Sequence, residues 1–229
     1  MYKISEQFKY HFPSWAATMT LKPFQEKVIQ NVLIQGNTLC IMPTGSGKSL
    51  IYYLSGLISG GITIVISPLV ALIDEQEQKL HDQGIETLAL HSGLTAEKQF
   101  CLLKQFAQKK INPKFIFASP EKLATDGFFE YCINCRKDEI KMITIDEVHC
   151  VSQWGMQFRP FYAEIPVFLS SVFGVEWPKI LALTATLNPR ELADVVAAFR
   201  IKTENILKYP QFIRSEISLK IMKCVNEDE

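Results

Sequence analysis

An excess of charge of either sign is absent from this chain. Its 229 residues include 24 basic and 24 acidic side chains, so the formal net charge is zero. A protein that holds nucleic acid through its overall charge is therefore not indicated, and any nucleic-acid site must be local. Hydrophobic residues make up 48% and charged residues 21% of the chain. That balance is ordinary for a globular protein, and the length allows one or two domains with a sizeable core.

Long hydrophobic runs are missing as well. The apolar stretches are too short to cross a bilayer, and residues 1–6 lack the apolar core of a signal peptide. Internal repeats and low-complexity segments are also absent. The sequence therefore predicts a soluble intracellular protein, in the cytoplasm and nucleoid or in a nucleus, with no membrane partner.

Cysteine motifs are scarce. Six cysteines are scattered along the chain, and only Cys132 and Cys135 have the spacing of zinc ligands. No second pair lies nearby, so two unpaired thiols at the end of a helix are the better interpretation. Cys40 and Cys101 have apolar sequence neighbours and are expected to be reduced core thiols.

A glycine loop between an apolar strand and an apolar helix is the feature around which the chain is organised. Its residues are Met42, Pro43, Thr44, Gly45, Ser46, Gly47, Lys48 and Ser49. Glycines let successive backbone N–H groups converge on a phosphate at a helix N-terminus. Lys48 would reach the β- and γ-phosphates of a nucleotide, and the Ser49 hydroxyl would bind Mg²⁺. The strict pattern has glycine in place of Met42, so a flexible turn is not excluded by the motif alone; the flanking strand and helix favour the phosphate site.

Strands alternate with helices about six times. The expected strands cover residues 38–41, 62–66, 87–90, 114–118, 141–145 and 179–183, and the expected helices include 23–35, 69–83, 95–110 and 188–199. This alternation predicts an α/β fold with a doubly wound, mainly parallel sheet and helices on both faces. Ligands of such sheets bind at the carboxyl ends of the strands. The glycine loop, the pair Asp146-Glu147 and the segment 184–186 all lie there.

An acidic pair ends one of the apolar strands. Asp146 would hold Mg²⁺ through water, and Glu147 would orient and deprotonate an attacking water. Acidic residues also begin surface loops, but beside a phosphate loop the hydrolase interpretation is favoured.

The segment that follows is unusually aromatic. Trp154, Phe158, Phe161 and Tyr162 lie within nine residues, with Arg159 among them, and no helix or strand period fits. Bases stack on aromatic rings and arginine contacts phosphates. An aromatic mini-core under a long loop explains the same composition equally well.

Taken together, the motifs resemble those of superfamily-two helicases, and specifically of the RecQ-like branch, from about residue 20 to about residue 220. Residues 42–50 look like motif I, Asp146-Glu147-Val148-His149 like motif II, and residues 184–186 like motif III. The resemblance implies a RecA-like P-loop NTPase that uses ATP and Mg²⁺ as the first motor domain of a DNA helicase. It also implies 3′ to 5′ translocation on single-stranded DNA and unwinding at duplex junctions.

The same resemblance assigns roles to further residues. The aromatic run 150–162 is similar to a RecQ loop that senses single-stranded DNA, with Trp154, Phe158 and Arg159 as the expected contacts. His149, Gln153, Thr184 and Thr186 would couple the ATP and DNA sites. Ser67, in a segment similar to motif Ia, would contact DNA phosphates. Residues 119–123 look like motif Ib.

The adenine site departs from the family pattern. Residues 21–25 resemble motif 0, in which Gln25 would hydrogen-bond the adenine edge. Lys22 stands where the family has arginine, so bidentate contacts are lost. Thr18 stands where an aromatic ring would stack on adenine, and Trp15 is a candidate substitute. A looser nucleotide preference than that of the family is expected.

The resemblance also divides the chain. Residues 1–20 are expected to form a helical lead-in, residues 21–205 the first RecA-like domain, and residues 206–229 a linker toward a second RecA-like domain that the chain lacks. That second domain carries the arginine fingers in the family. An arginine finger raises phosphoryl-transfer rates by ~10³–10⁵ in other enzymes. The chain alone is therefore expected to bind nucleotide and to turn it over weakly or not at all.

Two other functions are compatible with these motifs. One is an RNA-dependent ATPase or helicase of the same superfamily, against which His149 and the aromatic run argue. The other is a scaffold without motor activity that uses ATP binding as a switch for a protein partner.

Overall fold

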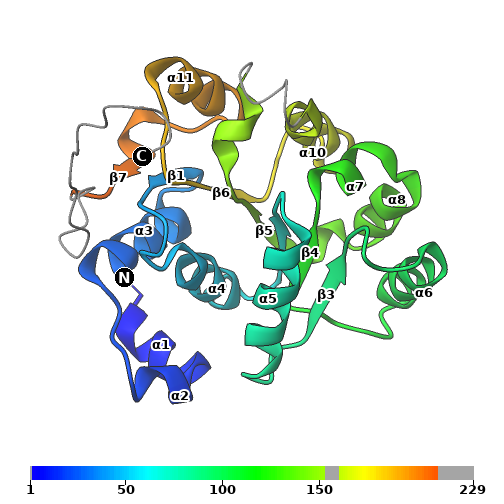
Figure 1. Ribbon diagram of the computed structural model, residues 1–229, viewed down its shortest axis with the longest axis horizontal. Helices are drawn as coiled ribbons and strands as arrows, with labels where there is room; N and C mark the ends of the chain where they lie inside the picture. The colour runs from blue at the N-terminus through cyan, green and yellow to red at the C-terminus, as the bar shows by residue number, and fades with distance from the viewer. Residues whose placement is uncertain (1, 153–159, 211–229) are drawn as a thin grey trace, which may run out of the picture.

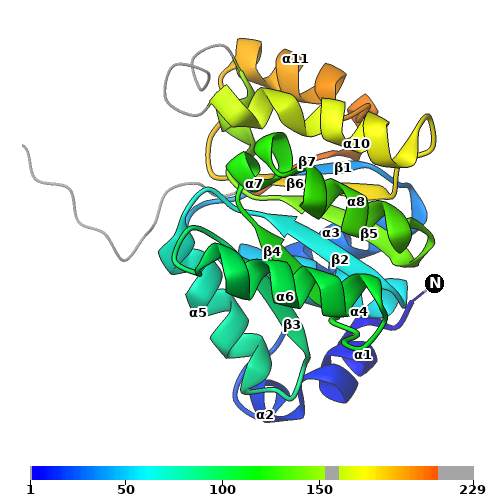
Figure 2. The same ribbon diagram turned by 90° about the vertical axis from the view of Figure 1, so that its right-hand side faces the viewer.

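The computed structural model describes residues 2–152 and 160–210, which form a parallel sheet between two layers of helices (Figure 1, Figure 2). The strands are β1 (Thr38–Ile41), β2 (Ile62–Ile66), β3 (Thr87–Leu90), β4 (Phe115–Ala118), β5 (Ile140–Ile145), β6 (Lys179–Thr184) and β7 (Ile206–Lys208). Their order across the sheet is β3-β4-β2-β5-β6-β1-β7, and every neighbouring pair is parallel. The predicted α/β fold is therefore confirmed.

The helices connect the strands in the manner of a doubly wound fold. They are α1 (Ile4–His11), α2 (Pro13–Ala16), α3 (Pro23–Ile34), α4 (Lys48–Ser59), α5 (Val70–His81), α6 (Ala96–Ala107), α7 (Pro120–Thr125), α8 (Gly127–Cys135), α10 (Ile165–Phe173) and α11 (Pro189–Ala198). In the described part of the chain, every helix is too short or too polar to span a bilayer.

Alternate residues of each strand enter two different cores. On β2, Ile62, Ile64 and Ile66 pack with α6, α8 and α10, whereas Val65 packs on the opposite face with α3 and α4. This use of both faces explains why the strand sequences are apolar throughout rather than alternating. All three isoleucines are at most 5% exposed.

Local sequence signals set several helix boundaries as predicted. The Thr95 hydroxyl accepts a hydrogen bond from the Lys98 backbone N–H at 3.3 Å and begins α6. Asn188 caps α11 through the N–H groups of Arg190 and Glu191, with Pro189 in the first turn.

Other elements differ from the expectation. Strand β7 lies beyond the boundary predicted at residue 205 and pairs with β1, so the sheet extends three residues into the predicted linker. Helix α10 was not predicted, whereas α8 agrees with the expectation that the cysteine pair lies at the end of a helix. Cys40 is buried as expected, but Cys101 is exposed on α6, because it faces away from the strip that Leu103 and Phe106 bury. Cys132 and Cys135 are free thiols in the last turn of α8.

Candidate active site

The glycine loop folds as a phosphate cradle between β1 and α4. Gly45 and Gly47 have φ angles of 74° and 93°, a region that favours glycine, and α4 begins at Lys48. The Ser46 backbone N–H donates to the Pro43 carbonyl at 3.3 Å, which closes the turn. The N-terminal N–H groups of a twelve-residue helix therefore face the cavity, as anion binding requires.

Met42 occupies the first loop position because that residue still belongs to the sheet. Its backbone N–H donates to the Thr184 carbonyl of β6 at 3.0 Å, and its side chain is fully buried. The turn starts one residue later, so the position does not require the freedom of glycine. The departure from the strict pattern does not distort the cradle.

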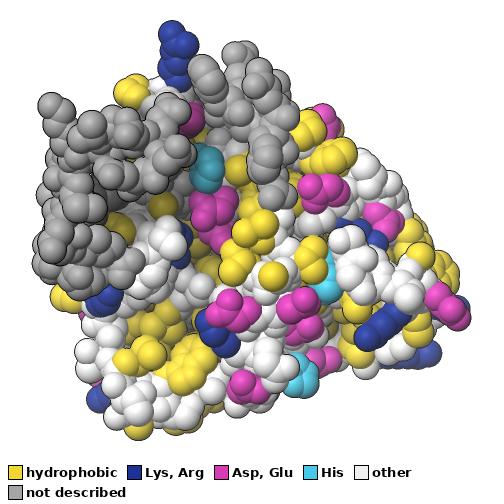
Figure 3. Space-filling view, viewed as in Figure 1, with side chains coloured by type: hydrophobic (Ala, Val, Ile, Leu, Met, Phe, Trp, Pro, Cys, Tyr) yellow, Lys and Arg dark blue, Asp and Glu magenta, His cyan; other side chains and the backbone are white. Residues whose placement is uncertain are grey.

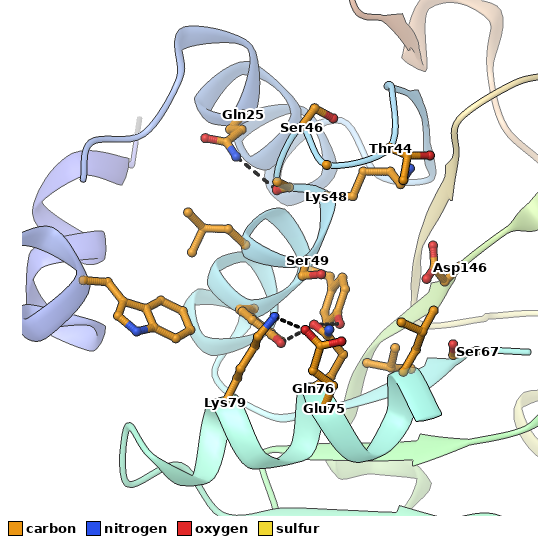
Figure 4. A pocket seen from close by; sticks show the side chains of 18 of the residues that line it. Gln25, Thr44, Ser46, Lys48, Ser49, Ser67, Glu75, Gln76, Lys79 and Asp146 are labelled. Carbon is orange, nitrogen blue, oxygen red and sulfur yellow. Dashed lines mark hydrogen bonds and ion pairs between the residues drawn. The ribbon is translucent and has the colours of Figure 1, made fainter. Parts of the chain in front are cut away.

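Gln25 on α3 braces the loop from outside. Its Oε1 accepts from the Lys22 N–H at 2.8 Å, and its Nε2 donates to the Gly47 carbonyl at 3.0 Å (Figure 4). A Cβ atom at Gly47 would lie 2.5 Å from this Nε2. Gln25 was predicted to recognise adenine; it lines the cavity, and in this structure its amide holds the loop to α3.

A cavity of about 750 Å³ opens beside the loop at the centre of the face in Figure 3, where acidic and histidine side chains gather. Its lining includes Lys22, Gln25, Thr44 to Ser49, Ser67, Asp146 and Glu147. The predicted nucleotide residues therefore share one cavity. The Lys48 ammonium donates to the Met42 carbonyl at 3.2 Å, and that of Lys22 to the Ser46 carbonyl at 3.4 Å.

Trp15 lines the same cavity from the N-terminal segment. One face of its indole stacks on Phe12, with centroids 4.7 Å apart and planes within 5°. The structure thus brings the candidate substitute for the missing adenine-stacking ring to the cavity. Met19 and Thr20, which the sequence did not single out, line it too.

Glu147 and His149 form a compact network with Thr184 and Thr186. Glu147 has a φ of 49°, which is uncommon for a residue with a side chain. Its carboxylate lies 3.3 Å from His149 Nδ1, and the same nitrogen lies 3.0 Å from the Thr184 hydroxyl of β6. Thr184 in turn donates to the Thr186 carbonyl at 3.0 Å. Three of the residues predicted to couple the sites are therefore connected.

The environment shifts the pKa values of the two carboxylates in opposite directions. Burial, and next the neighbouring charge of Glu147, raise the pKa of Asp146 to about 6. The hydrogen bond with His149 lowers the pKa of Glu147. Hydrogen bonds to the Cys150 sulfur and then to Glu147 raise the pKa of His149 to about 10. Glu147 is held as a carboxylate beside an imidazolium, whereas the nearby charges of Lys48 and His149 only partly offset the effect of burial on Asp146.

The donor set fits Mg²⁺. Asp146 and Ser49 both line the cavity and supply hard oxygen ligands, which suit Mg²⁺ with several retained waters. Within residues 2–152 and 160–210, no group of three or more His, Cys, Asp or Glu side chains could form a denser metal cage. One carboxylate and one hydroxyl agree with a cation held jointly with a nucleotide.

Helix α5 contributes residues that sequence reasoning weighed only loosely or missed. The Gln76 Oε1 accepts hydrogen bonds from the hydroxyls of Tyr52, at 3.0 Å, and Tyr53, both on α4. These residues line the lower part of the cavity in Figure 4, with Glu75 and Lys79 beside them. Gln76 is a half-buried contact between α4 and α5.

Ser67, which is predicted to contact DNA phosphates, is largely buried in this structure. It is 5% exposed and lines the cavity at the end of β2, next to Asp146 at the end of β5. The predicted contacts Gln153, Trp154, Phe158 and Arg159 lie outside the described residues. Tyr162 donates a hydrogen bond of 2.7 Å to the Asp146 carbonyl. Sequence reasoning had noted only its aromatic ring.

Comparisons with known proteins find similar helicases. The profile of the DEAD/DEAH box helicase family matches residues 22–195. The "ATP-dependent DNA helicase RecQ" of Bacillus subtilis is 35% identical over 192 residues, 84% of this chain and 31% of that protein. The "RecQ-like DNA helicase blm-1" of Caenorhabditis elegans is 34% identical over 204 residues, which cover 86% of this chain and 20% of that protein. The chain spans about a third or less of the length of these relatives.

Solved structures show the same fold. The Pyrococcus furiosus Hef helicase domain matches 82% of this chain and 38% of its own, with a TM-score of 0.59 and 18% identity. The structure of the helicase MrfA bound to DNA matches 91% of this chain and 30% of its own, with a TM-score of 0.69 and 19% identity. The loop, the acidic pair and the family profile converge: this chain belongs to the DEAD/DEAH box helicases, with relatives in the RecQ group.

Proposed function

We propose that this chain is the ATP-binding motor domain of a RecQ-type DNA helicase that moves 3′ to 5′ on single-stranded DNA. The observation that carries the proposal is the convergence of the phosphate loop and the Asp146-Glu147 pair on one cavity at the carboxyl ends of parallel strands. The names of the relatives support DNA as the nucleic acid.

Each cavity residue has a defined part in this proposal. The N–H groups of residues 45–49 and the Lys48 ammonium bind the phosphates. Ser49 and Asp146 hold Mg²⁺, which neutralises charge that develops on the phosphates. Glu147 orients the attacking water and accepts its proton; its lowered pKa keeps it ionised at neutral pH, and its φ of 49° directs the side chain into the cavity.

Coupling to DNA rests on the His149 network in this proposal. His149 contacts both Glu147, two residues after β5, and Thr184 at the end of β6, so a displacement of either strand end alters the orientation of the base. The aromatic run that holds Trp154, Phe158 and Arg159 begins only a few residues after His149. Occupation of that run by single-stranded DNA would be transmitted to Glu147 through this short path.

A second RecA-like domain completes the motor in the proposal. The part of each RecQ relative that matches this chain is about a third of that relative's length or less. An arginine supplied from such a domain accounts for ~10³–10⁵ in rate in other phosphate-transfer enzymes. ATP turnover by the present residues alone is therefore expected to be slow.

ATP turnover with and without single-stranded DNA tests the proposal, with Lys48→Ala as the blank. Glu147→Gln should retain nucleotide binding and lose turnover, whereas Lys48→Ala should lose binding. RNA of equal length is the matched comparison; stronger stimulation by RNA would contradict the assignment to DNA. If Glu147→Gln left turnover intact, the assignment of the base would be wrong. Nucleotide binding with no DNA binding would instead favour an ATP-switched scaffold.

A further inference from the structure

We infer that Ser67 is a positioning residue of the nucleotide site: its hydroxyl donates a hydrogen bond to the Asp146 carboxylate when that carboxylate holds the hydrated cation. The inference rests on the proposed function, because it concerns the same cavity. It departs from the sequence-based expectation that Ser67 contacts DNA phosphates.

Strand register brings the two residues together. β2 and β5 are parallel neighbours in which Ile66 pairs with Ile145. Ser67 and Asp146 are therefore the next residues along both strands, and the Asp146 N–H donates to the Ile66 carbonyl at 2.9 Å. Neighbouring strands lie about 4.8 Å apart. Both residues line the cavity, and Figure 4 shows them on the same side of it.

The Ser67 hydroxyl is buried without a hydrogen-bond partner. A buried polar group without a partner destabilises the folded state, because its hydrogen bonds to water are lost and not replaced. The backbone N–H of Ser67 has a partner, since it donates to the Ala118 carbonyl at 3.1 Å, whereas the side-chain hydroxyl has none. The hydroxyl of Thr184, at the end of the strand on the other side of β5, is by contrast fully engaged.

The Asp146 carboxylate is the group that could accept a hydrogen bond from Ser67. Its Oδ1 accepts from the Glu147 N–H at 3.0 Å. The charge is only partly compensated, because Asp146 is partly buried beside a second carboxylate, with Lys48 and His149 as the nearby positive charges. Carboxylates that hold metals are normally hydrogen-bonded by neighbouring groups, and loss of such a neighbour lowers metal affinity by about 10–100-fold. A rotation of the two side chains would satisfy both groups.

The test measures how much Mg²⁺ the 229-residue chain needs to bind a fluorescent, non-hydrolysable ATP analogue. Ser67→Ala should raise the Mg²⁺ concentration for half-maximal binding by about tenfold or more. Binding in EDTA should stay unchanged. Ser67→Thr, which retains a hydroxyl, should behave like the wild type.

Ser55→Ala is the matched control, since Ser55 is another buried serine whose hydroxyl has no partner and which does not line the cavity. It should leave the Mg²⁺ requirement unchanged. Removal of an unpartnered hydroxyl should not lower the melting temperature, so Ser67→Ala is expected to melt at or above the wild-type temperature. A purely structural role predicts a lower value.

An equal Mg²⁺ requirement in Ser67→Ala and Ser55→Ala would overturn the inference. So would weaker DNA binding by Ser67→Ala at an unchanged Mg²⁺ requirement, which would restore the DNA-phosphate assignment. If the wild type and Lys48→Ala alike failed to bind the analogue, the proposed function and this inference would both be wrong. Binding by the wild type with no effect at Ser67 rejects the inference alone.

Discussion

Strand β5 has an acidic residue near each end, and the two ends are built in opposite ways. Before the strand, Glu139 pairs with Arg136, which is 3% exposed. The Arg136 guanidinium also donates to the carbonyls of Phe106 and Ile111 and to the Asn112 side chain, at 2.9–3.1 Å. After the strand, the partly buried Asp146 lies beside Glu147, and among the described residues no ion pair joins Asp146 to a cation.

The pKa values record the difference. Hydrogen bonds from Arg136, and next from Lys109, lower the pKa of Glu139 to about 2, whereas burial raises that of Asp146 to about 6. A polar cluster whose groups all have hydrogen-bond and ion-pair partners stabilises the fold. A cluster in which some groups lack such partners can still bind a ligand. The completeness of the hydrogen bonding, more than the residue types, separates the structural end from the functional end.

Arg136→Met should have the largest effect on stability. It leaves two backbone carbonyls and the Glu139 carboxylate without their buried partner, so the free energy of unfolding should fall by roughly 3–5 kcal/mol. Urea denaturation measures it. Lys109→Met is the control, because Lys109 bonds the same carboxylate from a position that is 65% exposed, and a change within about 0.5 kcal/mol is expected. Equal losses would refute the structural role.

Asp146→Asn should act in the opposite sense. The free energy of unfolding should rise by up to about 3 kcal/mol at pH 7, because a buried charge is removed while the amide oxygen can still accept from the Glu147 N–H. Mg²⁺-dependent nucleotide binding should be lost in the same protein. A destabilised variant would show that the charge is compensated after all.

The pH dependence should separate the two ends further. The pKa of Asp146 in the folded protein lies above its unfolded value of 3.8. The contribution of Asp146 to the free energy of unfolding is therefore most favourable below about pH 4 and is lost as the pH rises to about 6. Glu139 has a folded pKa of about 2 against 4.5, so its contribution is present above about pH 4.5 and is lost as the pH falls toward 2. Denaturation of Asp146→Asn and Glu139→Gln against the wild type at pH 3, 5 and 7 measures both trends; parallel curves would contradict them.

Tyr162→Phe should have the smallest effect. It removes the hydroxyl that donates to the Asp146 carbonyl at 2.7 Å and preserves the buried ring. A loss of about 0.5–1.5 kcal/mol in the free energy of unfolding is expected. Tyr131→Phe, on a tyrosine that is 61% exposed, should change nothing measurable. A loss at Tyr162 no larger than at Tyr131 would show that this bond does not hold the strand end.

The sequence predicted six of the seven strands because fully buried parallel strands are continuous apolar runs with clear boundaries. Strand β7 escaped because three residues carry no period, and its place depends on pairing with β1 far back in the chain. The motif residues were predicted through local patterns. The bracing of Gly47 by Gln25 and the contact of Gln76 with two tyrosines were not, since they join elements whose proximity no local pattern encodes.

The strand order has a consequence for synthesis of the chain. β1 precedes the phosphate loop, yet its neighbours in the sheet are β6 and β7, with Thr38 opposite Leu181 and Leu39 opposite Ile206. Until those late strands emerge from the ribosome, β1 has no partner, and Met42 has no Thr184 carbonyl to anchor it. Contacts so distant in sequence form slowly and leave apolar strands open to aggregation. The strand made first is therefore among the last to gain its neighbours, and the phosphate loop that follows it stays unanchored until Thr184 has been translated.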